Sequence, residues 1–168
     1  VEMLFVAARG TSDHAGILAK YLFEIELGLP VCLAAPSVFT LYDAPVRLER
    51  ALVLGISQSG EAADVGEVVR RARDRGVLTA CITNHAGSSL AQAAEYPLLC
   101  HAGEEQSLPA TKTYTTSLAL LYRLAIAMGA RSELAKALER APAAMETTLG
   151  LDEAVAAMVE RYLSLIHI

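Results

Sequence analysis

Residues 51–61 read Ala-Leu-Val-Leu-Gly-Ile-Ser-Gln-Ser-Gly-Glu. The first six form an apolar run without polar alternation, which is typical of a strand buried on both faces of a parallel sheet. Small polar residues follow at 57–61, and a helical pattern then runs from about 63 to 75 and ends at Gly76. A strand that passes through a short polar loop into a helix is the building unit of a parallel α/β fold.

The same unit recurs on both sides of this stretch. Further strands are expected at 3–8, 31–34, 77–83 and 96–99, and further helices at about 14–27, 88–95 and 111–128. Connections between consecutive parallel strands are right-handed almost without exception. The sequence therefore predicts an α/β fold of flavodoxin-like type, with a five-stranded parallel sheet flanked by helices.

The expected organisation is a domain at 1–130, a helical connector at 131–162 that Pro142 interrupts, and a foreign end at 163–168. The last six residues match the translation of a sequencing-library adapter, so we leave them out of the interpretation. Within the domain, the helix at 111–128 is apolar around most of its circumference. Such a helix is expected to be covered on both sides, by the sheet and by a second domain or subunit.

Composition excludes several classes of protein. The chain has 168 residues, of which 54% are hydrophobic, and its formal net charge is −5. This much apolar surface argues against disorder, and the negative balance argues against nucleic acid as a partner. No apolar run reaches the length of a membrane span. Three cysteines without a Cys-x-x-Cys pair argue against a zinc site or a disulfide framework and favour the cytoplasm.

Three loops rich in small polar residues follow the expected strands, and each opens a helix: 10–12, 57–61 and 108–112. In an open parallel sheet, ligands bind beyond the carboxyl ends of the strands. Hydroxyl groups together with the N–H groups at a helix start form an anion site without lysine or metal. The alternative is that Ser57 and Ser59 simply cap the following helix. Neither a P-loop nor a Gly-x-Gly-x-x-Gly pattern is present.

These loops carry a resemblance to the sugar isomerase (SIS) domain family. The matching pieces are Ala-Arg-Gly-Thr-Ser at 8–12, Ile-Ser-Gln-Ser-Gly-Glu at 56–61, Ile-Thr-Asn at 82–84, Ala-Gly-x-Glu at 102–105 and Ala-Thr-Lys-Thr-Tyr-Thr at 110–115. The chain resembles the first of two SIS repeats in the isomerase half of glucosamine-6-phosphate synthase. It is more similar still to two-repeat relatives such as SIS-type glucosamine-6-phosphate deaminases.

The resemblance implies a role for each matching residue. The phosphate of a hexose 6-phosphate or amino-sugar phosphate would be bound by Ser57, Gln58 and Ser59, and the sugar hydroxyls by Gly10, Thr11 and Ser12. Leu108 and Ala110 would line the sugar. The synthase pattern has a Thr where this chain has Ala62 and a Ser where it has Ala110, so both departures speak against the synthase itself.

The same resemblance implies catalysis without a cofactor, by a base carboxylate that a second repeat supplies. Glu105 is the minor candidate for a base within this chain and otherwise organises the loop around Lys112, which would pair with Glu105 or Glu61. Arg9 is expected to form an ion pair, and residues 84–87 a turn. His85 and His101 lack companions at the spacing of a metal site.

Two functions from different classes remain open. The first is part of an enzyme that interconverts aldose and ketose amino-sugar phosphates, with aminotransferase, deaminase or isomerase outcome. The second is a non-catalytic SIS module that senses phosphosugars in a transcription regulator. The expected partners are the sugar phosphate, a second SIS repeat and a second subunit in a homodimer, with neither nucleic acid nor a membrane among them.

Overall fold

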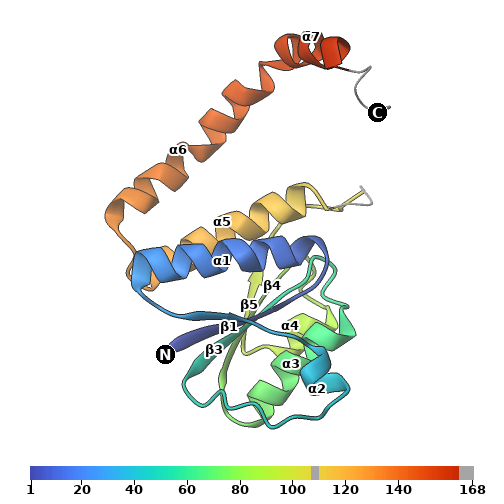
Figure 1. Ribbon diagram of the computed structural model, residues 1–168, viewed down its shortest axis with the longest axis vertical. Coiled ribbons are helices and arrows are strands. Elements are labelled where there is room, and N and C mark those ends of the chain that lie inside the picture. The colour runs from blue at the N-terminus through green and yellow to red at the C-terminus, as the bar shows by residue number, and fades with distance from the viewer. Residues whose placement is uncertain (107–109, 163–168) are drawn as a thin grey trace. The chain divides into compact units, whose positions relative to one another are not determined.

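Five parallel strands form one sheet in the part of the chain that the computed structural model describes, residues 1–106 and 110–162 (Figure 1). In chain order they are β1 (Met3–Ala8), β2 (Val31–Leu33), β3 (Ala51–Ile56), β4 (Leu78–Thr83) and β5 (Tyr96–Leu99). Their spatial order is β2-β1-β3-β4-β5. This is the strand order of flavodoxin-like folds, so the predicted fold class is confirmed.

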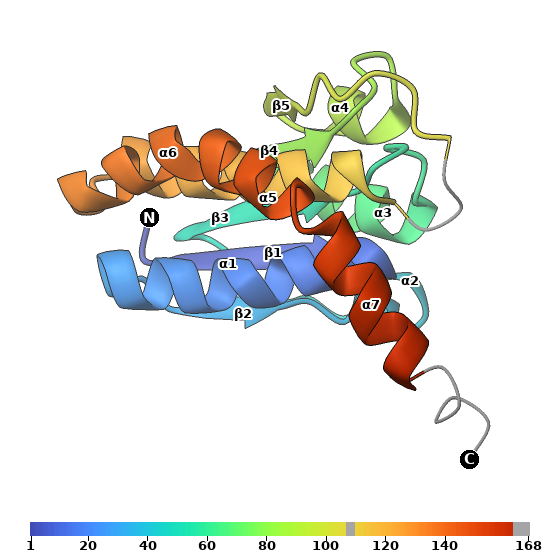
Figure 2. The same ribbon diagram turned by 90° about the horizontal axis from the view of Figure 1, so that it is seen from above.

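Helices cover both faces of the sheet. On one face α1 (Thr11–Leu27) and α5 (Lys112–Ala127) lie side by side, and the other face carries α2 (Ser37–Thr40), α3 (Ala63–Asp74) and α4 (Ser89–Ala93) (Figures 1 and 2). The helix at α3 follows the apolar spacing of the sequence, because its buried residues recur at intervals of three and four: Val65, Val68, Val69 and Ala72. Full burial of each of these valine side chains stabilises the folded protein by about 1.5–3 kcal/mol.

The short helix α2 is absent from the sequence prediction. Its four residues are too few to show a helical period. They nevertheless bring Phe39 into the core, where its ring meets that of Phe5 edge to face with centroids 6.0 Å apart. The connection from β2 to β3 therefore contributes to the hydrophobic core as well as spanning the sheet.

Helix α5 is covered on one side within this chain, so the prediction that a second domain or subunit covers its other side stays a prediction. Its buried residues form a single stripe spaced by four, Thr113, Ser117, Leu121 and Ala125. The remaining apolar side chains of α5 are partly buried or exposed. The stripe is narrow because the helix packs against α1 and the sheet only along this line.

A second compact unit begins at Ser132, after a first unit at Val1–Arg131. It contains α6 (Ser132–Leu149) and α7 (Asp152–Tyr162). The predicted interruption at Pro142 is wrong, because α6 continues through that residue and the break comes at Gly150. A proline weakens or kinks a helix without always ending it. The segment predicted to be foreign, 163–168, lies outside the described residues.

No helix among the described residues combines the length and the apolar character that a bilayer crossing requires.

Candidate functional site

The loops that follow β1, β3 and β4 meet at one edge of the sheet. Ala8 pairs with Ile56 and Ile56 pairs with Ile82 in the parallel register, so these three strands end almost level. The loops at 9–12, 57–62 and 84–88 therefore leave the sheet side by side. This is the edge where open parallel sheets bind their ligands.

The loop at 57–61 is built from its own short hydrogen bonds. The buried Ser57 Oγ accepts the N–H of Gly60 at 3.2 Å, and Ser59 Oγ accepts the N–H of Glu61 at 3.2 Å. In the described residues neither serine hydroxyl donates its proton to an acceptor. Each hydroxyl thus holds the loop through its oxygen and can still donate its O–H to another group.

The serines do not cap α3. The residue before the helix is Ala62, which makes no side-chain cap, and within the first turn the N–H of Val65 donates to Asp64 Oδ1 at 2.9 Å. The alternative interpretation of Ser57 and Ser59 as helix caps is therefore wrong, because their oxygens bond within the loop. The start of α3 consequently lacks a side-chain cap at the point where the loop presents its hydroxyls, which favours an anion there.

The segment after β4 holds the loop in place. The carbonyl of Gln58 accepts the N–H of Asn84 at 3.0 Å, and the carbonyl of Gly60 accepts the N–H of Leu90 at 2.9 Å. The carboxylate of Glu61 accepts both the N–H of Ser89 at 3.1 Å and its hydroxyl at 2.5 Å. The hydrogen bond from the Ser89 hydroxyl is the main cause that lowers the pKa of Glu61.

Gly60 is the point of closest approach in this assembly. Its φ is +70°, and a Cβ at this position would lie 2.1 Å from Ser88 Oγ and 2.4 Å from Ser88 Cβ. An L side chain disfavours this backbone conformation, and here it also has no space. The loop conformation therefore depends on a glycine at 60.

A cavity of about 580 Å³ opens beside the loop. Its lining is Ser59, Glu61, Asn84, His85, Ala86, Gly87 and Ser88. The sequence prediction contained Ser59 but interpreted the stretch at 84–87 only as a turn. Its position directly after a strand at the same sheet edge was the available signal that it belongs to the site.

The loop at 9–12 reaches the same edge at the start of α1. Gly10 has a φ of +59°, and Thr11 and Ser12 form the first turn of the helix. Arg9 pairs with Asp64 in the first turn of α3 at 3.2 Å, as the sequence analysis expected. This ion pair links the first loop to the helix that follows the second loop.

The carboxylate of Glu105 is held by the start of α5. It accepts the backbone N–H and the hydroxyl of both Thr111 and Thr113, with a shortest distance of 2.7 Å to Thr113 Oγ1. The Thr113 hydroxyl is the main cause that lowers the pKa of Glu105 to about 2. So acidic a carboxyl group is a weak proton acceptor, which favours the organising role of Glu105 over the catalytic one.

The loop before α5 is only partly described. Leu108 lies outside the described residues, whereas Ala110 is partly buried and Lys112 is exposed. The four hydrogen bonds to Glu105 come from the two threonines, not from the Lys112 side chain. The structure thus gives the threonines the role that the sequence analysis gave to Lys112.

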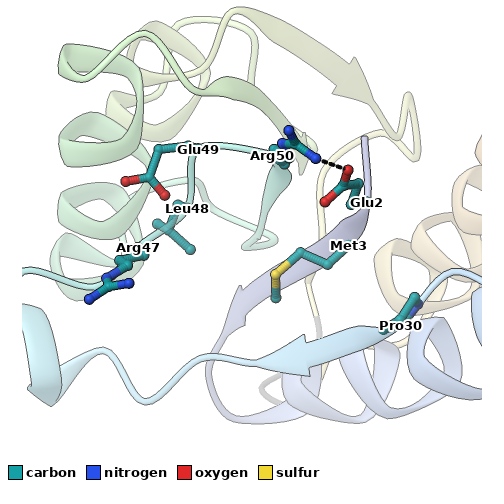
Figure 3. Close-up of a pocket in the computed structure, with 7 residues that line it drawn as sticks. All are labelled: Glu2, Met3, Pro30, Arg47, Leu48, Glu49 and Arg50. Carbon is teal, nitrogen blue, oxygen red and sulfur yellow. Dashed lines mark hydrogen bonds and ion pairs between the residues drawn. The ribbon is translucent and has the colours of Figure 1, made fainter.

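A second cavity, of about 460 Å³, lies at the opposite, amino-terminal edge of the sheet (Figure 3). It is lined by Glu2, Met3, Pro30, Arg47, Leu48, Glu49 and Arg50. Arg50 pairs with Glu2 across it. The described residues of the chain hold no group of three or more His, Cys, Asp or Glu side chains suited to a metal ion.

Comparison with known proteins agrees with this geometry. The chain is 37% identical over 161 residues to glutamine–fructose-6-phosphate aminotransferase (isomerizing) of Aquifex aeolicus, covering 95% of this chain and 27% of the relative. It is 44% identical over 149 residues to the enzyme of the same name from Methanothermobacter thermautotrophicus, covering 89% and 25%. It therefore spans about a quarter of the length of these curated relatives.

Solved structures give the same result. A protein of Silicibacter pomeroyi assigned as a phosphosugar isomerase superposes with a TM-score of 0.80 at 40% identity, over 84% of this chain and 43% of that one. The C-terminal domain of glucosamine-fructose-6-phosphate aminotransferase from Francisella tularensis superposes with a TM-score of 0.80 at 27% identity, over 96% and 48%. The profile of the SIS domain matches residues 2–127, and this chain belongs to the SIS domain family.

Proposed function

We propose that this chain is the phosphosugar-binding SIS domain of a protein that interconverts aldose and ketose amino-sugar phosphates. One observation carries the proposal: the loop at 57–61 presents unused serine hydroxyls at the start of α3, where the N-cap residue Ala62 makes no side-chain cap. Neutral donors at a helix start stabilise a phosphate without metal or lysine. Relatives named for fructose 6-phosphate support a hexose 6-phosphate as the ligand.

Each part of the site has a proposed task. Ser57, Gln58 and Ser59 donate hydrogen bonds to the phosphate, and the loop at 10–12 meets the sugar hydroxyls. Ala110 lines the sugar together with Leu108. The phosphate then fixes one end of the sugar, so that the reacting carbons lie at a constant distance from this edge of the sheet.

Proton transfer between the first two sugar carbons needs a base. We propose that this base does not come from this chain. Glu105 is engaged by two threonines and has a pKa of about 2. We therefore place the base in a second SIS repeat, as the family resemblance implies, and propose chemistry without a cofactor. The ammonia-transferring, deaminating and purely isomerising outcomes share this proton transfer.

The proposed location of the protein is the cytoplasm.

The enzyme function is preferred to the phosphosugar sensor. Curated relatives that carry an enzyme name are 35–44% identical to this chain, and they align over most of it. A sensor would share the loop at 57–61, which we call the phosphate loop, but would not need the proton transfer.

A phosphorylated sugar is expected to stabilise the protein, because a ligand that binds only the folded state raises the free energy of unfolding by RT ln(1 + L/Kd), where L is the concentration of free ligand. At a concentration a hundred times its Kd this gain is about 2.7 kcal/mol. For a chain of this length it raises the melting temperature by about 5–10 °C. The measurement is thermal unfolding with fructose 6-phosphate, with fructose and with inorganic phosphate.

Fructose is the matched control, because it differs only in the phosphate. An equal shift with fructose and with fructose 6-phosphate would refute the phosphate site. No shift with fructose 6-phosphate at any tested concentration would refute the proposed function.

We also propose that the intact protein contains a second SIS repeat and that it forms a homodimer. The chain covers 43% and 48% of two solved structures on which it superposes with a TM-score of 0.80. On its own, α1 exposes an apolar stripe at Ile17, Tyr21 and Ile25, of which Tyr21 is 64% and Ile25 67% exposed. Exposed apolar stripes of this kind are typical of interfaces.

The purified chain is therefore expected to self-associate at micromolar concentration. The Tyr21→Lys and Ile25→Lys substitutions should shift it toward the monomer in light scattering, because they place charge in the buried contact. The control is Glu95→Lys, which introduces a lysine at an exposed position before β5. A monomeric unmodified chain would contradict this interface.

A further inference from the structure

The cavity beside the phosphate loop is lined in part by a basic side chain, that of His85, which has no task in the proposed function. Among the described residues that line it, Glu61 and His85 are the ionisable ones, and none is Lys or Arg. With His85 neutral, the lining has a net negative charge, because the pKa of Glu61 is lowered. A negative carboxylate beside a phosphate weakens its binding unless a positive charge compensates it.

The backbone of His85 is fixed while its side chain is exposed. Its N–H donates to Thr83 Oγ1 at 3.4 Å, and its carbonyl accepts the hydroxyl of Ser88 at 2.7 Å. The preceding Asn84 is bonded through its side chain to the backbone of Ala102 and Gly103. The backbone of His85 is therefore fixed at the wall of a cavity that Ser59, from the other loop, also lines.

The charged groups around His85 come from two elements. The loop after β3 brings Glu61, whose carboxylate is close enough for the charge of His85 to contribute to its lowered pKa. The segment bonded to Asn84 brings His101, Glu104 and Glu105, none of which lines the cavity. Helix α4 has no charged residue.

We propose that His85 is a specificity-determining residue whose protonated imidazole offsets the charge of Glu61 and strengthens phosphate binding at acidic pH. The inference rests on the proposed function, because the anion is the phosphate of the proposed ligand. A phosphate dianion stabilises the imidazolium, so the proposed ligand binds the protonated imidazole more tightly than the neutral one. The contribution of His85 to affinity is then larger at acidic than at alkaline pH.

The first measurement is calorimetric titration of the 168-residue chain with fructose 6-phosphate between pH 5.5 and 8. His85→Asn removes the charge, and His101→Asn is the matched control on the neighbouring segment. The ratio of the Kd of each variant to that of the unmodified chain cancels the ionisation of the free sugar phosphate, which is the same for every protein. For an exposed charge pair, the ratio for His85→Asn should be about threefold to fivefold at pH 5.5 and near one at pH 8.

The second measurement needs no substitution. Proton NMR of the histidine rings gives the pKa of His85 with and without fructose 6-phosphate. Coupling is reciprocal, so the same threefold to fivefold preference raises the pKa of His85 by about 0.5–0.7. The pKa of His101 should stay constant.

Three results overturn the inference in distinguishable ways. A pH-independent ratio for His85→Asn, or an unchanged pKa of His85 while fructose 6-phosphate binds, overturns the role of His85 and leaves the proposed function standing. An equal effect of His101→Asn overturns the assignment to His85. Absence of binding by the unmodified chain at every pH overturns the proposed function and this inference together.

Discussion

Gly60→Ala is expected to destabilise the protein by about 2–5 kcal/mol. The left-handed conformation at φ +70° costs an alanine about 1–2 kcal/mol, and the overlap with Ser88 adds about 1–3 kcal/mol of overpacking. This sum is a large part of the 5–15 kcal/mol by which a domain is usually stable. Urea unfolding monitored by circular dichroism gives the change in free energy.

Gly66→Ala is the matched control. Gly66 lies inside α3, and a Cβ there meets no atom within 4 Å. Replacing a helical glycine by alanine stabilises a helix by about 0.5–1 kcal/mol. Equal effects of the two substitutions would show that the close contact between Gly60 and Ser88 does not determine the conformation of the phosphate loop.

Ser59→Ala is expected to weaken the binding of fructose 6-phosphate by about ten- to a hundredfold. A hydrogen bond to a charged group contributes about 1.5–3 kcal/mol, and Ser59 is exposed with its hydroxyl proton unused. Ser57→Ala should have an effect of similar size on affinity. It should also lower stability, because the buried Ser57 oxygen accepts the N–H of Gly60.

Calorimetry measures both affinities. Ser132→Ala, at the start of α6 in the other compact unit, is the control and should bind like the unmodified chain. An unchanged Kd for Ser59→Ala would remove that hydroxyl from the phosphate site. A loss of affinity for Ser132→Ala of the same size would mean that the effect is not local.

The sheet could be predicted because buried parallel strands have a distinctive composition. The predicted bounds of β1, β3 and β5 are those of the structure, since each is an apolar run enclosed by turn residues. The short α2 could not be found, because four residues carry no period. The prediction of an interruption at Pro142 was wrong because it applied the rule that proline ends a helix, whereas α6 continues through Pro142.

The site could be predicted only where it follows directly from a strand end. Ser57 and Ser59 were placed correctly at the edge of the sheet, but the direction of their hydrogen bonds was not accessible. Which partner Glu105 selects also depends on how a loop folds back onto α5, over a separation of eight residues to Thr113. His85 was considered only as a metal ligand, because its position beside a cavity that two separate loops line does not follow from the sequence.

The most direct test of the account is to locate fructose 6-phosphate on the protein. Amide NMR spectra of the uniformly ¹⁵N-labelled chain, recorded with and without the sugar phosphate, report which backbone groups change. We expect changes at 10–12, 57–62 and 84–88, in the loops at the carboxyl ends of the strands. Changes concentrated at Arg47–Arg50, in the arginine-containing cavity at the opposite edge, would contradict it (Figure 3).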